Sequence, residues 1–179
     1  MPRDSGNESG FAGWDPARRK VVAWYDPSMT AAAGSTLSGL DFLRAIRDGK
    51  LPPPPIAELM NFTMREIEPG RVLFECEPDE SAYNPIGVVH GGLVCTLADT
   101  VAACAVHTTL ESGMAYTSID LNVSYLRPVT ATSGVLRATG RVTKPGRRVA
   151  YSAAEIVDGA GKLVATATSS CLVMGRRAS

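Results

Sequence analysis

The feature that most constrains the fold is a turn-like stretch, Asn84 to Gly92, that leads directly into an apolar run from Leu93 to Leu110. The only formal charge in this helix-like run is Asp99. Burying an unpaired carboxylate among apolar side chains costs several kcal/mol, so a chain keeps one there only when something uses it. The pattern therefore predicts a buried helix that carries one functional acid.

The start of this predicted helix is a second candidate. Glycines let a backbone come close to a ligand, and unpaired N–H groups at a helix start attract negative charge. The amide of Gly91 or Gly92 could therefore hold a carbonyl oxygen that gains charge during a reaction. Asp99 lies about 12 Å further along, at about 1.5 Å per residue. If both groups act on one small centre, the carboxylate comes from a second copy of the chain.

Composition excludes several classes of protein. Lys plus Arg equals Asp plus Glu at 18 each, which argues against a nucleic-acid partner. The charges are uneven, since residues 51–120 carry 2 basic and 10 acidic side chains and residues 121–179 carry 9 and 2. The N-terminus lacks a signal-peptide core, and no apolar run reaches the length of a membrane span. We therefore expect a cytoplasmic protein with no membrane partner.

Cysteine and histidine usage argues against disulfides and metals. The four cysteines form no Cys-x-x-Cys pair, which predicts free thiols in a reducing compartment. Two histidines and dispersed cysteines offer no metal-ligand spacing, so no metal site is expected.

The chain divides into an N-terminal arm with a short helix, residues 1–55, and a main domain, residues 56–179. Residues 1–34 are rich in Gly, Ser and Pro and predict a loosely docked arm. Ser38 could cap a short helix that Gly49 ends. In the main domain, alternating patterns predict strands, with Glu68-Pro69-Gly70 as a hairpin turn. These long strands suit an antiparallel sheet curled around the helix, an α+β fold, and they span residues 62–67, 71–77, 115–126, 134–143, 147–157 and 162–174.

Several of these motifs occur together in one collinear order over roughly residues 56–175. They are Asn84, the His90-Gly91-Gly92 triplet, Leu97-Ala98-Asp99-Thr100, Tyr116 to Asn122, and Tyr125-Leu126-Arg127-Pro128. The combination resembles the hotdog-fold acyl-CoA thioesterases of the phenylacetic-acid-degradation (PaaI) type. The resemblance implies a long central helix wrapped by a curved antiparallel sheet. It also implies an acyl-CoA substrate with no separate cofactor, and a homodimer with its site between subunits, two such dimers pairing into a homotetramer.

The resemblance also implies roles for individual residues. The Gly91 amide would polarise the carbonyl, and Asp99 would attack it or activate a water molecule. Asn84 and Ser118 would place the water or the thioester, with His90 beside the oxyanion site. Some relatives carry Glu in place of this Asp, which leaves the choice between attack and water activation open.

The cationic end of the chain suggests where coenzyme A binds. Arginine holds phosphate bidentately, so Arg127, Arg147 and Arg148 are candidates for its phosphates, with the Gly92 amide as a further contact. Solvated strand ends are the simpler explanation for these arginines.

Simpler explanations also exist for the other candidates. Asn84 precedes Pro85 and could be a turn residue, Ser118 could only pack, and His90 could only order its loop. His107, near the helix end, is expected to interact with the last carbonyls. Two rival functions remain: an acyl-CoA hydratase or dehydratase that pairs His90 with Asp99, and a non-catalytic acyl-CoA-binding module.

Overall fold

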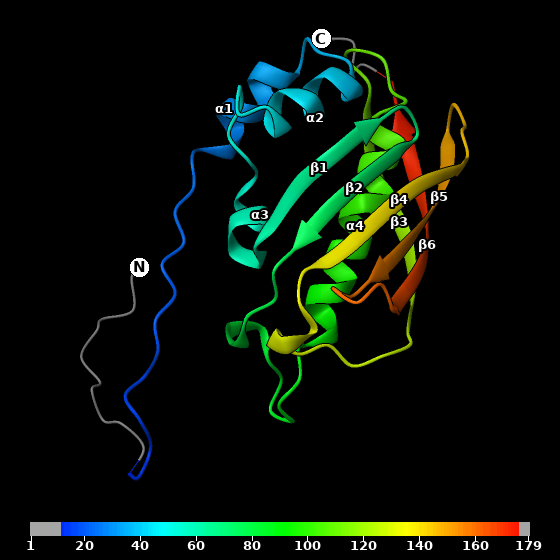
Figure 1. The fold of residues 1–179 in the computed structure, drawn as a ribbon. Coiled ribbons are helices and arrows are strands. Elements are labelled where there is room, and N and C mark those ends of the chain that lie inside the picture. Colours follow the sequence, from blue (N-terminus) through cyan, green and yellow to red (C-terminus); the bar gives the residue numbers. More distant parts are fainter. Residues whose placement is uncertain (1–11, 176–179) are drawn as a thin grey trace.

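One long helix lies against a curved sheet (Figure 1). The computed structural model describes residues 12–175. Helix α4 (Gly91–His107) packs against an antiparallel sheet of six strands in the order β1-β2-β4-β5-β6-β3. The strands are β1 (Phe62–Glu68), β2 (Arg71–Cys76), β3 (Ala115–Tyr125), β4 (Leu136–Lys144), β5 (Val149–Val157) and β6 (Leu163–Met174). The predicted α+β hotdog architecture is confirmed.

The sequence pattern explains the first hairpin. The turn between β1 and β2 needs a residue with positive φ, and Gly70 supplies it at +73°. Along β2, Val72, Phe74 and Cys76 alternate toward the core, whereas the residues between them are only partly buried. The expected hairpin is confirmed.

Helix α4 and the sheet approach each other most closely at one glycine. Leu97, Val101 and Ala105 of the helix are fully buried against the sheet. At Gly140 in β4, an added Cβ would lie 2.0 Å from the carbonyl oxygen of Val101. Helix and strand therefore meet backbone to backbone, with no room for any side chain.

The N-terminal segment contains three short helices: α1 (Pro27–Gly34), α2 (Gly39–Arg47) and α3 (Pro55–Met60). Only α2 was expected, and its predicted cap is confirmed because Ser38 Oγ accepts from Asp41 N at 3.1 Å. Helix α1 lies within the stretch expected to be a loose arm. Its start has a common sequence pattern, an Asp followed by a Pro at the first helical position. In the structure, Asp26 caps the helix by accepting a hydrogen bond from Ser28 N. Residues 1–11 of the expected arm lie outside the described residues.

Helix α2 is anchored on the end of α4. Leu43 and Ile46 are buried, and Gly39 N donates to Leu110 O at 3.0 Å. An added Cβ at Gly39 would lie 1.9 Å from the carbonyl oxygen of His107. The helix therefore docks against α4 through a contact that only glycine permits.

Two further expectations concern thiols and membranes. All four cysteines are free, as predicted. Within residues 12–175, no helix has the length and apolar character needed to cross a bilayer.

Candidate functional site

The structure joins two of the predicted site residues. Asp99 lies half-buried on α4, and its Oδ1 accepts a hydrogen bond of 2.8 Å from Ser118 Oγ on β3. A hydroxyl donor orients a carboxylate and partly compensates its burial. Asp99 is therefore held in a fixed direction at the side of the helix.

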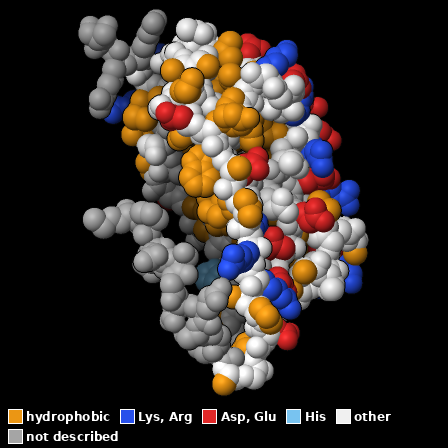
Figure 2. Space-filling model, turned by 90° about the vertical axis from the view of Figure 1, so that its left-hand side faces the viewer, with side chains coloured by type: hydrophobic (Ala, Val, Ile, Leu, Met, Phe, Trp, Pro, Cys, Tyr) orange, Lys and Arg blue, Asp and Glu red, His pale blue; other side chains and the backbone are white. Residues whose placement is uncertain are grey.

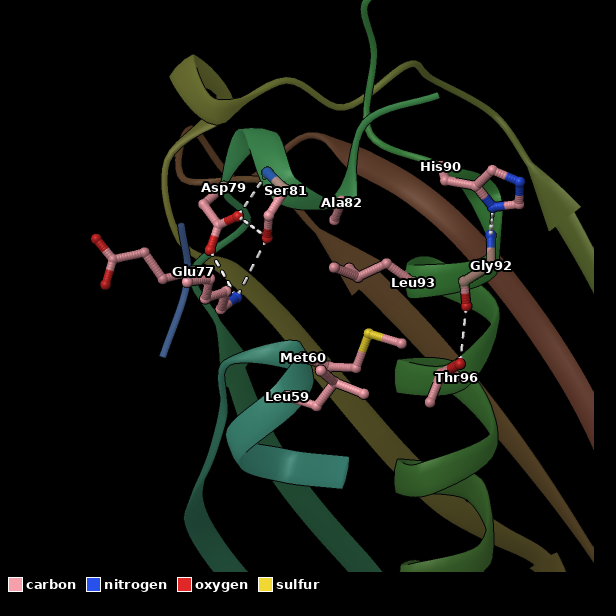
Figure 3. Close-up of a pocket in the computed structure, with 11 residues that line it drawn as sticks. Leu59, Met60, Glu77, Asp79, Ser81, Ala82, His90, Gly92, Leu93 and Thr96 are labelled. Atoms are coloured by element: carbon pink, nitrogen blue, oxygen red, sulfur yellow. Dashed lines mark hydrogen bonds and ion pairs between the residues drawn. The ribbon is translucent and has the colours of Figure 1, made fainter. Parts of the chain in front are cut away.

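At the helix start, the structure distinguishes between the two candidate amides. His90 caps α4, and its Nδ1 accepts from Gly92 N at 2.8 Å (Figure 3). Because the Nδ1 atom of His90 accepts this hydrogen bond, the proton of a neutral imidazole ring is on Nε2. The Gly92 amide is thus occupied, whereas the Gly91 amide has no acceptor among residues 12–175. Gly91 is the amide that can receive a carbonyl oxygen.

Strand β3 contacts both Asp99 and the start of α4. Tyr125 Oη donates a hydrogen bond of 3.1 Å to Gly91 O, and Ser118 Oγ donates one to Asp99 Oδ1. These two strand residues are seven positions apart, which on a regular strand would place them on opposite faces. A bulge between Ser118 and Asp120 shifts the alternation, so both side chains face α4.

The other predicted site residues lie nearby or at the opposite end of the strand. Asn84 Oδ1 accepts from Ile86 N at 3.1 Å and from Val88 N at 3.4 Å, so its carbonyl oxygen serves the turn. Arg127 follows β3 and lines a hollow that it shares with Gly91. Arg147 and Arg148 are exposed in the turn between β4 and β5. That turn is near the Asp99 end of β3, because Val149 pairs with Leu172 and Leu172 with Thr117.

His107 does not serve the last carbonyls of α4, so this expectation is wrong. The hydroxyls of Thr108 and Thr109 do so instead, donating to Ala105 O at 2.6 Å and to Val106 O at 2.7 Å. The His107 ring is enclosed between Phe42 and Tyr116, with ring centroids 5.7 and 4.8 Å away. Phe42 comes from α2, far away in sequence, so no local signal predicts this cluster.

Two cavities flank the exposed side of α4. A cavity of about 390 Å³ lies beside the helix start, where Leu93, Met60 and Leu59 line its interior (Figure 3). Lys20 and Asp79 also line it and form an ion pair of 2.8 Å. A larger cavity of about 680 Å³ lies further along α4, beneath the N-terminal helices. Neither cavity could be predicted from the sequence, because each is lined by segments that are distant in the chain.

Burial keeps three titratable side chains beside the larger cavity neutral. Desolvation raises the pKa of the Cys104 thiol to about 12 and raises that of Tyr116 well above its ordinary value. It lowers the pKa of His107 from 6.5 to about 4. All three side chains are therefore uncharged at neutral pH.

The buried histidine should make stability depend on pH. An unfolded chain protonates His107 near pH 6.5, but the folded protein resists until about pH 4. Between these values the unfolded state binds more protons, so the free energy of unfolding should fall by up to about 3 kcal/mol as the pH drops. Urea denaturation at pH 7 and pH 4.5 measures the difference.

The control for this prediction is His107→Phe, which keeps an aromatic ring between Phe42 and Tyr116. The variant should lose most of the stability change between pH 6.5 and pH 4.5. An identical pH dependence in wild type and variant would contradict the prediction.

The fold defines a class. A long helix packed against a curved antiparallel sheet of six strands is the hotdog fold. Comparison with known proteins agrees, because residues 86–165 match the model of the thioesterase superfamily. The chain belongs to this superfamily and has the hotdog fold of its PaaI-type members.

Individual relatives support this assignment. Human acyl-coenzyme A thioesterase 13 is 33% identical over 108 residues, which cover 60% of this chain and 76% of the relative. A phenylacetic acid degradation-related protein of Ralstonia eutropha superimposes with a TM-score of 0.67 at 33% identity, covering 73% of this chain and 98% of that one. The Escherichia coli PaaI protein shares the fold with a TM-score of 0.67 at 24% identity, covering 78% and 97%.

Proposed function

We propose that the protein hydrolyses acyl-CoA thioesters in sites formed between two copies of the chain. The observation that carries this proposal is the arrangement on β3, where Ser118 holds Asp99 and Tyr125 contacts Gly91 on the same face. The related human protein is named an acyl-coenzyme A thioesterase, which agrees with a CoA thioester as the substrate.

Strand β3 is suited to pair with a second copy of itself. It is the last strand of the sheet, and within residues 12–175 its outer edge pairs with no other strand. Ile119 and Tyr125 are each 54% exposed along it. A long edge strand with apolar side chains invites pairing with another chain, and an antiparallel pair around a twofold axis is the simplest closed arrangement.

Such pairing would bring the two halves of the site together. In one chain, Ser118 and Tyr125 lie about 20 Å apart along the strand. An antiparallel pair centred midway between them would set Tyr125 of one copy beside Ser118 of the other. The Gly91 amide would then face the partner's Asp99 across the interface, and Arg127 would lie on the same side as the partner's Arg147 and Arg148, near the CoA phosphates.

The reaction follows from these positions. The substrate carbonyl oxygen accepts from the Gly91 amide, which stabilises the charge that develops there. Asp99 removes a proton from water while the water oxygen bonds to the carbonyl carbon. The C–S bond then breaks and the CoA thiolate leaves, to be protonated by solvent. Direct attack by Asp99 gives a mixed anhydride that water cleaves, and reaches the same products.

A subunit-mixing experiment tests the shared site. Gly91→Pro removes the amide hydrogen, and proline is tolerated at a first helical position. The preceding residue, His90, already has the extended backbone that proline requires, with φ −62° and ψ 133°. Gly91→Pro and Asp99→Asn should each be inactive alone. Unfolded and refolded together, they should regain about a quarter of wild-type thiol release, because half of the dimers carry one intact site of two.

The controls separate this result from its alternatives. Gly91→Ala keeps the amide while placing the same Cβ near Tyr125, and it should stay active. No recovery on mixing would place the site within one chain. Loss of enoyl absorbance without thiol release would support a hydratase, and tight acyl-CoA binding without turnover would support a binding module.

A further inference from the structure

The larger cavity is an apolar chamber built by the N-terminal segment. Its volume is about 680 Å³, which is within the range of small-molecule sites. One wall is α4 and β1, and the opposite wall is the N-terminal segment with its proline run. Its apolar lining includes Phe42, Leu43, Ile46, Pro53, Met64 and Phe74. Figure 2 shows hydrophobic side chains gathered on this side of the molecule.

The cavity lies close to the proposed catalytic acid. Thr100, which lines it, directly follows Asp99 on α4, although Asp99 itself is not part of the lining. The charge of Asp99 contributes to the raised pKa of Cys104, a further residue of the lining. A substrate whose carbonyl carbon meets Asp99 would therefore have apolar side chains close by for its acyl chain.

The smaller cavity differs in position and size. It lies beside the Gly92 end of α4 and has a volume of about 390 Å³. Charged side chains line both cavities, namely Lys20, Glu77 and Asp79 in the smaller one and Arg47, Glu58 and Arg65 in the larger one. The larger cavity suits an acyl chain because of its greater volume and because its lining begins at Thr100, next to Asp99.

We propose that the larger cavity receives the acyl chain of the substrate, so that the N-terminal segment selects aliphatic chains of medium length. The inference rests on the proposed thioesterase function. From Thr100 to His107 the cavity follows α4 for about 10 Å, the length of an extended chain of about eight carbons. The rings of Phe42, His107 and Tyr116 pack together at its far end. This end wall is uncharged at neutral pH and fits a terminal methyl group.

The proposal predicts a chain-length profile. Each methylene that leaves water should raise kcat/KM about fourfold, the equivalent of about 0.8 kcal/mol. For the wild type, kcat/KM should therefore rise steeply from acetyl-CoA to octanoyl-CoA and level off by dodecanoyl-CoA. Thiol release from this series measures the profile.

Two variants test which cavity holds the chain. Met64→Trp fills part of the larger cavity and should lower kcat/KM for octanoyl-CoA at least tenfold more than it lowers kcat/KM for acetyl-CoA. Phe42→Ala opens the far end and should favour dodecanoyl-CoA over octanoyl-CoA. The matched control, Leu59→Trp, fills the smaller cavity instead and should not alter the preference for chain length. A length preference that follows Leu59→Trp and ignores Met64→Trp would overturn the inference.

A binding measurement keeps this test independent of turnover. The octyl thioether of coenzyme A cannot be hydrolysed, and calorimetry should show that it binds the wild type at least tenfold more tightly than it binds Met64→Trp. Equal binding to the two proteins would also overturn the inference. A wild type that binds the thioether in this way but releases no thiol from any acyl-CoA would instead refute the proposed hydrolysis.

Discussion

Asp99→Asn is expected to lower kcat for acyl-CoA hydrolysis by about a hundred- to ten-thousandfold, the usual contribution of a general base. The amide keeps the size of the carboxylate, and its oxygen can still accept the hydrogen bond from Ser118. Substrate binding should therefore persist, and the loss should appear in kcat with little change in the dissociation constant. Thiol release together with calorimetric binding of the octyl thioether separates the two quantities.

The matched control for this variant is Asp120→Asn on β3, the strand that also carries Ser118. Asp120 is exposed, and its Oδ1 accepts from Ser170 N, a bond that asparagine preserves. Its kcat should stay within twofold of the wild type. Undiminished thiol release by Asp99→Asn would remove Asp99 from the mechanism, whichever copy of the chain supplies it.

Gly140→Ala is expected to cause a large loss of stability from a single methyl group. The new Cβ would lie 2.0 Å from the carbonyl oxygen of Val101 and 2.4 Å from its carbonyl carbon. These are backbone atoms within α4, so relief requires the helix and sheet to separate. We expect the free energy of unfolding to fall by about 4 kcal/mol, at the upper end for point substitutions. Urea denaturation measures it.

Gly175→Ala is the matched control, because an added Cβ there meets nothing within 4 Å. Its free energy of unfolding should stay within about 0.5 kcal/mol of the wild type. A Gly140→Ala protein that unfolds at the wild-type urea concentration would show that helix and strand do not meet at this point.

The parts of the fold that sequence could predict are those with local causes. The helix from residue 91 follows from apolar residues after a glycine pair, and the hairpin follows from Pro69-Gly70 between alternating residues. Asp99 stood out because it is the only charge in its helix. The two unexpected helices, α1 and α3, are short, and α3 begins within the proline run, where the composition favours an extended chain.

The parts that sequence could not predict depend on long-range packing. The Gly92 amide is occupied because the His90 ring turns back to accept from it, which is a choice of rotamer. The cluster of Phe42, His107 and Tyr116 joins three segments that no periodicity relates. For the same reason, the cavity beneath the N-terminal helices has no signature in the sequence.

The bulge in β3 carries a consequence for how this strand tolerates insertions and deletions. Its extra residue puts the stretch before it and the stretch after it in different phases of the pleat, and both phases are needed for Ser118 and Tyr125 to face the same helix. Deleting one residue here would leave the hydrogen-bonded ladder largely intact but rotate one of these side chains outward. We therefore expect that deleting one residue from this strand abolishes function while the protein still folds.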